Sequence, residues 1–403
     1  MGTVVVLGYR KGLDRALARR GLDVFHVVAK VKSALEDRPY RLVAGLEDAQ
    51  EVLRAVLAAE LRDVVGVVTT HEEAVFSAEL VREHFGVSVG GSPATALRFR
   101  DKYLQKTALP ETVRRARCRY LAADSSFEEV AGELGTPFIV KPSNGAGSVR
   151  TVRVGTEEEF RRYLKENPPL TGASLVAESF MTGREIHADG VWAGGRVRWF
   201  SIGGYHESPI AWNSGGVLAD QTLSREEHPE LFRRAGELLA ESLGALGTPD
   251  CVFHLEAFDD GQDALVFSEC GLRLAGAHVP EVVELTYGIN LYEAVAAVAL
   301  GEPLQPLLEP AGRPASPEQY YGFVYLRRFE GVPLTRADFE QRFPIVELDF
   351  PDGDDVRERI YGRVGHAVVA APDGERLTRL IADLVSSNRF GSTGSGSTGS
   401  ADA

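Results

Sequence analysis

The sequence is poor in cysteine. Its 403 residues include only three, Cys118, Cys251 and Cys270. They form no CxxC pair and show no metal-ligand spacing, so the sequence indicates neither a disulfide framework nor a structural zinc site. Such sparse thiols suit a reducing compartment, and we therefore expect a cytoplasmic protein.

Long apolar runs are also missing. No stretch approaches the roughly 20 apolar residues that a membrane helix needs. The first residues, MGTVVVLGYRKG, carry an apolar run that is too short for a signal peptide and is followed by basic residues. We therefore expect no membrane association.

Basic residues are outnumbered by acidic ones. The 44 Lys and Arg residues face 58 Asp and Glu residues, which gives a formal net charge of -14. This balance argues against general binding to nucleic acid or to an anionic membrane surface. It still leaves room for a local basic pocket that binds phosphates.

What the sequence does contain is typical of a soluble globular protein with two or three domains, with 44% hydrophobic and 25% charged residues. In residues 1–96, short apolar runs alternate with helical patterns that end at glycine, which predicts a parallel α/β domain. We expect strands at 3–7, 23–29 and 63–70 and helices at 11–21, 46–61 and 74–86.

Two further domains are expected, at 97–183 and 184–390, followed by a flexible Gly/Ser/Thr tail at 391–403. Long strands dominate the third domain, so the α/β pattern becomes α+β toward the C-terminal part. In the second domain we expect helices at 98–109, 126–135 and 156–167, a strand–turn–strand unit at 137–154 and strands at 118–123 and 174–180. In the third we expect a hairpin with a Gly-Gly turn at 184–205, helices at 229–244 and 288–301 and strands at 251–258 and 264–273.

Two carboxylates are expected to oppose each other in a hairpin. If the loop is 261–264, Phe258 faces Phe267 and Glu256 faces Glu269. Opposed carboxylates repel each other, and a hard cation such as Mg²⁺ relieves that repulsion. Alternation also places His254 and Arg273 on the same face. A solvated strand face with a tighter turn at 260–261 is the alternative.

A glycine-rich turn follows the strand that carries Lys141. Its residues Ser143 to Ser148 include Gly145 and Gly147. Glycines let backbone N–H groups approach phosphate oxygens, and the lysine adds a positive charge. A plain hairpin turn with a surface lysine explains the same residues. Neither a Walker A loop nor protein-kinase motifs occur.

A third cluster, VAESFMTGREIHADG, contains Glu178, Phe180, Met181 and Glu185. Backbone groups of such a connector can recognise adenine, and a nearby carboxylate can accept ribose hydroxyls. By itself the cluster is explained equally well by a surface hairpin.

The order and spacing of these pieces resemble the ATP-grasp superfamily of carboxylate–amine ligases over roughly residues 1–310. The segment from Glu269 to Gly276 has the form E-x-x-x-R-x-x-G, which is similar to the L-amino-acid ligase (bacilysin synthetase-type) subgroup. The resemblance implies an N-terminal parallel α/β domain, a small central lid domain and a larger C-terminal antiparallel-sheet domain.

The resemblance also implies roles for individual residues. Glu256 and Glu269 correspond to magnesium ligands, and Arg273 to the arginine that stabilises the acyl phosphate and the tetrahedral intermediate. Nucleotide contacts are implied for Lys102, Lys141, Ser143, Gly145, Gly147, Ser148, Glu178, Phe180, Met181 and Glu185. Catalytic roles are expected for Arg273, Lys141 and Glu269, and substrate contacts for His187, Asp189, His206, Trp212, His254 and Gly276.

The activity implied is ATP-dependent joining of a carboxylate to an amine through an acyl phosphate, with release of ADP and phosphate. ATP and Mg²⁺ are the expected cofactors, with Mn²⁺ as an alternative metal. The expected partners are small-molecule acids and amines, with a dipeptide or an amino-acid amide as product, and a homodimer is left open. The candidate general bases are His187, Asp189, His206, Glu207 and His254.

One position departs from the wider superfamily. Many members carry asparagine two residues after the second glutamate, where this chain has Gly271. A nucleotide-binding protein without ligase activity is therefore the alternative. A nicotinamide oxidoreductase is disfavoured, because the first turn reads GYRKG and lacks GxGxxG.

Overall fold

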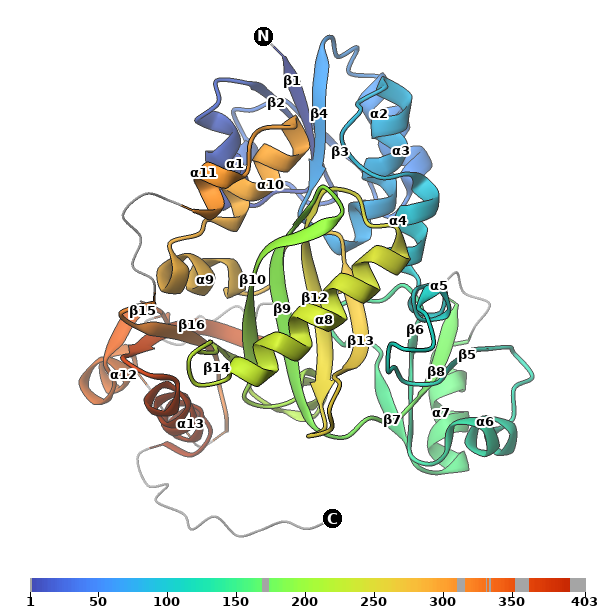
Figure 1. The fold of residues 1–403 in the computed structure, drawn as a ribbon, viewed down its shortest axis with the longest axis vertical. Coiled ribbons are helices and arrows are strands. Elements are labelled where there is room, and N and C mark those ends of the chain that lie inside the picture. The colour runs from blue at the N-terminus through green and yellow to red at the C-terminus, as the bar shows by residue number, and fades with distance from the viewer. Residues whose placement is uncertain are drawn as a thin grey trace.

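The protein is built around three β-sheets (Figure 1). The structure is a computed structural model that describes residues 2–168, 174–309, 316–330, 332, 335–351 and 362–391. A four-stranded sheet lies at the N-terminal end, a second four-stranded sheet forms a small unit at the lower right, and an eight-stranded sheet runs through the centre. The predicted mixed α/β architecture is confirmed.

The N-terminal sheet is parallel, with strand order β3-β2-β1-β4. Its valine-rich strands are buried, as expected for a parallel sheet that helices cover. The elements are β1 (Thr3–Leu7), α1 (Lys11–Ala18), β2 (Asp23–Val28), the short 3-10 turn η1 (Ser33–Leu35), β3 (Tyr40–Leu42), α2 (Ala49–Leu57), β4 (Val64–Thr69), the 3-10 turn η2 (Glu72–Ala74) and α3 (Val75–Phe85).

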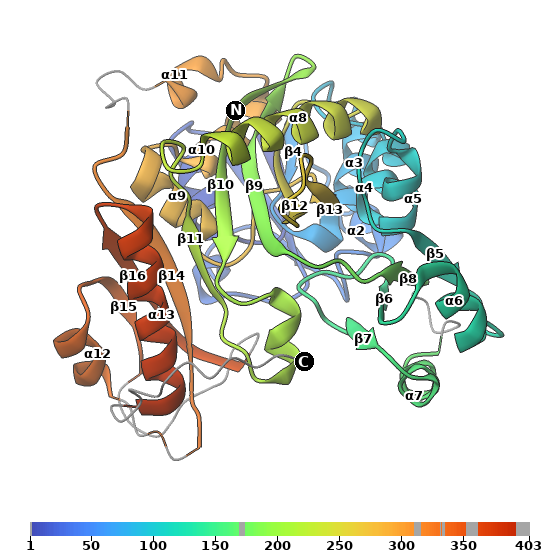
Figure 2. The same ribbon diagram turned by 60° about the horizontal axis from the view of Figure 1, so that its bottom comes forward.

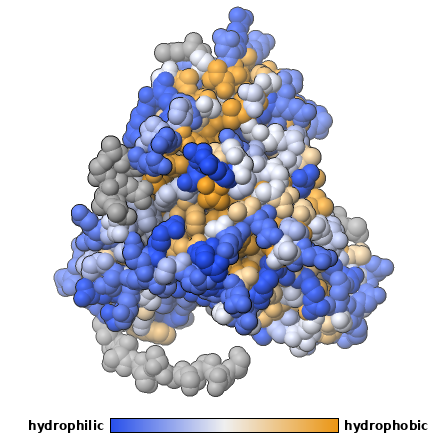
Figure 3. Space-filling view, viewed as in Figure 1, coloured by the Kyte–Doolittle hydropathy of each residue, from blue (hydrophilic) through white to orange (hydrophobic). Residues whose placement is uncertain are grey.

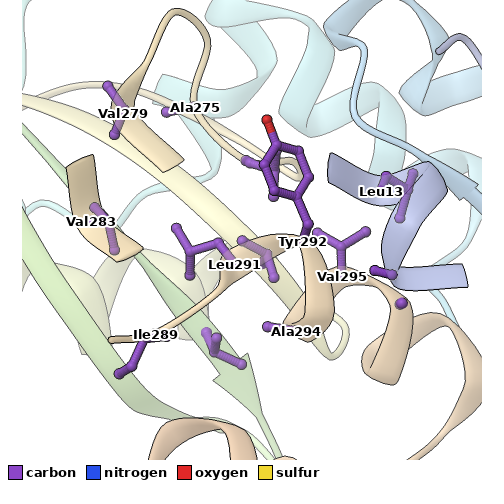
Figure 4. Packing of buried hydrophobic residues seen from close by; sticks show 14 of the residues in the cluster. Leu13, Ala275, Val279, Val283, Ile289, Leu291, Tyr292, Ala294 and Val295 are labelled. Atoms are coloured by element: carbon purple, nitrogen blue, oxygen red, sulfur yellow. The ribbon is translucent and has the colours of Figure 1, made fainter. Parts of the chain in front are cut away.

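Three helices come from much later in the chain, α9 (Val279–Tyr287), α10 (Leu291–Leu300) and α11 (Gln305–Leu308). Of these, α10 packs against α1 and β4 of this domain, whereas α9 packs against the large sheet described below. Figure 4 shows Leu13 of α1 beside Tyr292 and Val295 of α10, and all three belong to one buried cluster. A Cβ atom at Gly12 would overlap the Tyr292 ring, so glycine permits the close approach of these helices.

Among the described residues, no single helix is long and apolar enough to cross a membrane. The helices α9 and α10, which are bent by 100° relative to each other, together have the length and apolar composition of a membrane span. Both helices contribute residues to the buried cluster just described.

The prediction of one continuous helix at 98–109 is wrong, because the helical conformation is interrupted at Asp101. There are two helices, α4 (Pro93–Arg100) and α5 (Lys102–Ala108). Asp101 is extended, and its carboxylate accepts the backbone N–H groups of Tyr103 and Leu104 at 3.0 Å each. A side chain that caps the next helix in this way competes with helix continuation. The break places Lys102 at a helix start, where its backbone N–H donates to the Ser143 carbonyl at 2.9 Å.

The small second sheet is antiparallel and has the order β5-β8-β6-β7. Phe138 and Phe160 are buried in its core, and both of its helices begin with a capping box. Its elements are β5 (Cys118–Leu121), α6 (Phe127–Leu134), β6 (Phe138–Pro142), β7 (Val152–Val154), α7 (Glu157–Glu166) and β8 (Leu175–Ser179).

The large sheet is antiparallel, with order β13-β12-β9-β10-β11-β14-β16-β15 (Figure 2). The predicted hairpin at 184–205 is confirmed, with Gly194 and Gly195 at φ +61° and +73°, as a two-residue hairpin turn requires. The elements are β9 (Arg184–Ala193), β10 (Arg196–Tyr205), the 3-10 turn η3 (Pro209–Ser214), β11 (Ala219–Thr222), α8 (Pro229–Leu246), β12 (Cys251–Asp259), β13 (Val266–Gly271), β14 (Tyr320–Arg327), α12 (Arg336–Arg342), β15 (Ile345–Asp349), β16 (Arg363–Ala371) and α13 (Gly374–Phe390).

The surface agrees with the acidic, polar composition. On the face in Figure 3, hydrophilic residues cover the periphery and apolar residues gather toward the middle. The domain boundaries at 96/97 and 183/184 stay predictions, and residues 392–403 of the predicted flexible tail lie outside the described residues.

Candidate active site

A cavity of about 770 Å³ lies where the three sheets meet. Its wall includes segments that follow the carboxyl ends of β1 and β4, the edge at which parallel sheets bind ligands. The predicted residues in its wall are Lys102, Lys141, Gly145, Gly147, Ser148, Glu178, Phe180, Met181, Glu185, Trp212, His254, Glu256, Glu269, Arg273 and Gly276. The predicted residues outside its wall are Ser143, His187, Asp189 and His206.

The two predicted metal carboxylates do face each other, because Glu256 pairs with Glu269 between β12 and β13. The predicted pairing of Phe258 with Phe267 is wrong. The register shifts after Glu256, so Phe258 lies opposite Val266 and Phe267 lies opposite Ala257. A β-bulge of this kind adds one residue to one strand, and alternation alone does not reveal it.

Two lysines neutralise Glu269. The Lys102 Nζ lies 3.2 Å from its Oε2 and the Lys141 Nζ lies 3.9 Å away. Burial alone would raise the pKa of the Glu269 carboxyl. The positive charges of the two lysines outweigh burial and lower this pKa to about 2. Lys102 also donates to the Gly145 carbonyl at 2.7 Å, so the lysines stand beside the glycine-rich turn. The site therefore holds fixed positive charge where phosphates would lie against that turn.

A third carboxylate, Glu185, adds to the negative side of the cavity. Burial and the neighbouring Glu256 raise its pKa to about 7, although Ser208 Oγ donates to it at 2.7 Å. Glu256 accepts the Tyr205 hydroxyl at 3.2 Å. Three carboxylates with mutual repulsion are a donor set that fits a hard divalent cation, which prefers oxygen ligands. Glu256 and Glu269 would hold it, as predicted.

The Glu178 carboxylate is used by two lysines. Lys141 lies 2.9 Å from it and Lys106, which the sequence reading missed, lies 2.8 Å from it. Burial and the positive charge of Lys141 outweigh Glu178 and lower the pKa of Lys106. Burial also opposes the charge of Lys141, but Glu178 and Glu269 together raise its pKa. The predicted adenine connector, Phe180 and Met181, follows directly and lines the cavity.

This buried ion pair predicts acid sensitivity. Burial raises the pKa of Glu178, but Lys106 and Lys141 lower it from 4.5 to about 2 in the folded protein. A carboxyl with a lowered folded pKa stabilises the fold fully above its unfolded pKa, and that contribution is lost as pH falls from 4.5 toward about 2. Chemical denaturation at a series of pH values measures the free energy of unfolding. Over this range it should fall more steeply with decreasing pH for the wild type than for Glu178→Gln. Parallel profiles would contradict the assignment.

The glycine-rich turn is held from two sides. Asn213 in η3 donates its Nδ2 to the Ser148 carbonyl at 2.9 Å and to the Thr151 carbonyl at 3.2 Å. Arg100 at the end of α4 donates to the Asn144 carbonyl. Ser148 has a φ of +56°, an uncommon conformation for a residue other than glycine. The turn and its flank thus contact both the end of α4 and the 3-10 turn η3.

Arg273 reaches the cavity from a loop. The prediction that it shares a strand face with Glu269 is wrong, because β13 ends at Gly271. Arg273 donates its Nη1 to the Leu274 carbonyl at 2.7 Å and its Nε to Glu72. Burial lowers the pKa of this guanidinium, but Glu72 more than compensates, so its pKa is raised. Arg273 is a permanent positive charge in the cavity wall.

The candidate general bases occupy different places. His187 and Asp189 are buried in a hydrogen-bonded chain that runs from Asp220 through His187 (2.7 Å) and Asp189 (2.5 Å) to His254 (2.9 Å). His254 lines the cavity. Burial lowers the pKa of its imidazole, but the negative charge of Asp189 outweighs burial, so the pKa is raised. Its protonated form is favoured, which disfavours it as a base. Neither His206 nor Glu207 lines the cavity, and Glu207 pairs with Arg389 at 2.8 Å.

The potential ligand atoms of His187, Asp189 and His254 lie within 4.8 Å of one another, close enough to hold a metal ion. Their side chains already satisfy each other at hydrogen-bonding distance, with Asp220 as a further partner. The geometry therefore accounts for their burial without an ion.

One part of the cavity wall lies around Gly276. Arg10 follows β1, lines the cavity and donates its Nη1 to the Ala275 carbonyl at 3.2 Å. Trp212 lines the cavity and also packs against a buried core cluster, so its predicted substrate contact stays a prediction. Sequence reading missed Arg10 and Glu72. Both come just after parallel strands, and that position was the available signal.

No family model matches the chain. The L-arginine-specific L-amino acid ligase of Bacillus subtilis is 24% identical over 238 residues, which are 57% of this chain and 56% of that enzyme. The chain thus spans little more than half the length of this curated relative.

Solved structures resemble the chain over almost its whole length. The L-amino acid ligase from Bacillus licheniformis has a TM-score of 0.75 at 19% identity and covers 95% of this chain and 97% of its own. The carboxyaminoimidazole ribonucleotide synthase from Aspergillus clavatus, complexed with ATP, has a TM-score of 0.73 at 17% identity and covers 96% and 99%. At these identities the likeness establishes the fold.

Proposed function

From the ATP-grasp fold of this chain, which confirms the resemblance read from its sequence, we propose an ATP-dependent ligase that joins a carboxylate to an amine. The observation that carries the proposal is the convergence of Lys102, Lys141, Glu256, Glu269 and Arg273 on one cavity. These residues come from three separate parts of the chain. Together they supply cations for phosphates, carboxylates for a metal and a guanidinium for the reacting carbonyl.

In the first step, a carboxylate oxygen of the acid attacks the γ-phosphorus of ATP, and ADP leaves with the electrons of the broken P–O bond. The step brings two anions together. Lys102 and Lys141 reduce their repulsion and fix the phosphates beside Gly145. A divalent cation held by Glu256 and Glu269 supplies further charge neutralisation when it is bound.

In the second step, the neutral amine attacks the carbonyl carbon of the acyl phosphate, the C–O bond breaks, and the phosphate leaves as hydrogen phosphate with the proton that the amine nitrogen loses. Negative charge develops on the carbonyl oxygen. Arg273 stabilises that charge, and one such donor is worth about 3 kcal/mol. The turn from Ser143 to Ser148 keeps water from the acyl phosphate, since it lies over the lysines that bind the phosphates.

Amino acids are the substrates that we propose for both sides. Arg10 and Arg273 both line the cavity, as do Ala275 and Gly276, and Arg10 donates to the Ala275 carbonyl, so both arginines can bind substrate carboxylates there. The names of two relatives, both L-amino acid ligases, support this choice. The ribonucleotide synthase neighbour has the same fold, so the fold alone does not select the substrate. A cytoplasmic location and a homodimer stay predictions.

The test is a matrix of acids and amines, which includes all pairs of proteinogenic amino acids. We expect ADP release that requires both an acid and an amine, with a product whose mass equals their sum less one water. ATP binding without such turnover across the whole matrix would instead support the alternative, a nucleotide-binding protein without ligase activity. Turnover with a non-amino-acid amine alone would refute the dipeptide assignment and retain the ligase.

A further inference from the structure

Glu72 is a carboxylate that none of the proposed steps uses. It opens the turn η2, directly after β4 of the N-terminal sheet, and it lines the cavity. Its side chain is only 13% exposed. A mostly buried carboxylate needs charged partners, and Glu72 has two of them.

The first partner is Arg273, whose Nε donates to Glu72 Oε2. The second is Arg100, whose Nη1 lies 2.5 Å from Glu72 Oε1. Arg100 extends the connection, because its Nη2 donates to the Asn144 carbonyl in the glycine-rich turn. One carboxylate thus links the arginine proposed to act on the acyl group with the turn proposed to cover the phosphates.

Glu72 also accounts for Gly271. A Cβ atom added to Gly271 would lie 2.9 Å from Glu72 Oε2, closer than real Cβ atoms come to other atoms. Gly271 occupies the position at which many ATP-grasp enzymes carry asparagine. A side chain at position 271 would therefore press against the Glu72 carboxylate, which Arg273 and Arg100 hold in place.

We propose that Glu72 is a positioning residue that couples Arg273 to closure of the glycine-rich turn. Its carboxylate fixes the Arg273 guanidinium from one side and, through Arg100, tethers the turn at Asn144. The acyl phosphate is then shielded from water in the same arrangement that presents Arg273 to its carbonyl. This role rests on the proposed ligase function.

The variant that tests this role is Glu72→Gln, which keeps the shape of the side chain and removes its charge. We expect kcat for amide formation to fall about 100-fold, since small misplacements of catalytic groups have effects of this size. The KM for ATP should change much less than kcat, because Glu72 pairs with Arg273 and Arg100, whereas the two lysines of the phosphate site pair with Glu269. Phosphate released per amide formed should rise well above one.

That ratio separates positioning from folding. A purely structural defect lowers the amount of active enzyme and leaves the ratio unchanged. The matched control is Glu79→Gln in α3, which removes another buried carboxylate of the same domain, one that pairs with Arg82 and is not among the residues that line the cavity. We expect this control to lose stability and to keep the wild-type ratio.

A second measurement does not depend on turnover. The backbone N–H of Gly145 donates to the Pro142 carbonyl at 3.3 Å, and that of Thr151, just after the turn, donates to the Ser148 carbonyl at 3.1 Å. Their hydrogen exchange should be faster in Glu72→Gln and in Arg100→Gln, which cuts the same tether at its other end. Gly271→Ala should resemble Glu72→Gln, and the double variant should be little worse than either single variant.

Unchanged kcat, unchanged ratio and unchanged exchange in Glu72→Gln would overturn the proposal. If Glu72→Gln does not fold, Arg100→Gln decides between the same outcomes. If the wild-type enzyme shows no turnover in the substrate matrix, the ligase function fails. The exchange measurement then still decides whether Glu72 tethers the turn.

Discussion

Replacing Glu269 by glutamine is expected to abolish turnover, with kcat lowered by about 10³-fold. Glu269 is the residue on which the site converges. It lies opposite Glu256, 3.2 Å from Lys102 and 3.9 Å from Lys141. The amide cannot supply the negative charge that a divalent cation and two lysines require. Steady-state ADP release with the best acid–amine pair measures the loss.

The fold should survive this change. The substitution removes the repulsion between Glu269 and Glu256, while Lys102 keeps the Gly145 carbonyl and Lys141 keeps Glu178. The melting temperature of Glu269→Gln should therefore stay close to that of the wild type. Glu237→Gln, on the exposed face of α8, is the control and should retain normal kcat. Near-normal activity in Glu269→Gln would show that the metal and phosphate assignment is wrong.

Lys141→Met is expected to have the second-largest effect, a fall of about 10³-fold in kcat/KM for ATP. Lys141 lies between Glu178 and Glu269, and methionine keeps much of its length without its charge. Glu178 retains Lys106 as a buried partner, so the small second sheet should remain folded. Isothermal calorimetry with ATP and Mg²⁺ separates the loss of nucleotide affinity from the loss of kcat.

The matched control for this variant is Lys165→Met. Lys165 lies in α7 of the same small domain and is exposed. The Lys165→Met variant should bind ATP with the same affinity as the wild type. If Lys141→Met instead bound ATP with unchanged affinity and turned over normally, the cationic groups of the phosphate site would have to be sought elsewhere.

Local patterns explain what the sequence could predict. An assumed hairpin loop at 261–264 placed Glu256 opposite Glu269, and this pair is found, although the bulge after Glu256 shifts the register on the side of the turn. The Gly194-Gly195 turn predicted the hairpin of β9 and β10 and its register next to the turn, up to a bulge between Val197 and Trp199.

Long-range packing explains what the sequence could not predict. Glu72 contacts Arg273 across 201 positions of the chain, and Arg10 contacts Ala275 across 265. Lys106 joins Glu178 across 72 positions, and nothing in its own helix marks it as a site residue. Asp220 lies in β11, a strand of four residues that is too short to show a clear period. Such contacts depend on how the domains pack, which residue spacing does not encode.

The central claim is that a carboxylate is activated by phosphorylation. It is tested most directly with an acid labelled with ¹⁸O in both carboxylate oxygens, paired with the amine that the matrix identifies. Attack of one labelled oxygen on the γ-phosphorus, followed by cleavage of the C–O bond, transfers that oxygen to phosphate. We predict one ¹⁸O atom in each phosphate released during amide formation, as measured by mass spectrometry. Phosphate that carries no label from the acid would contradict the account.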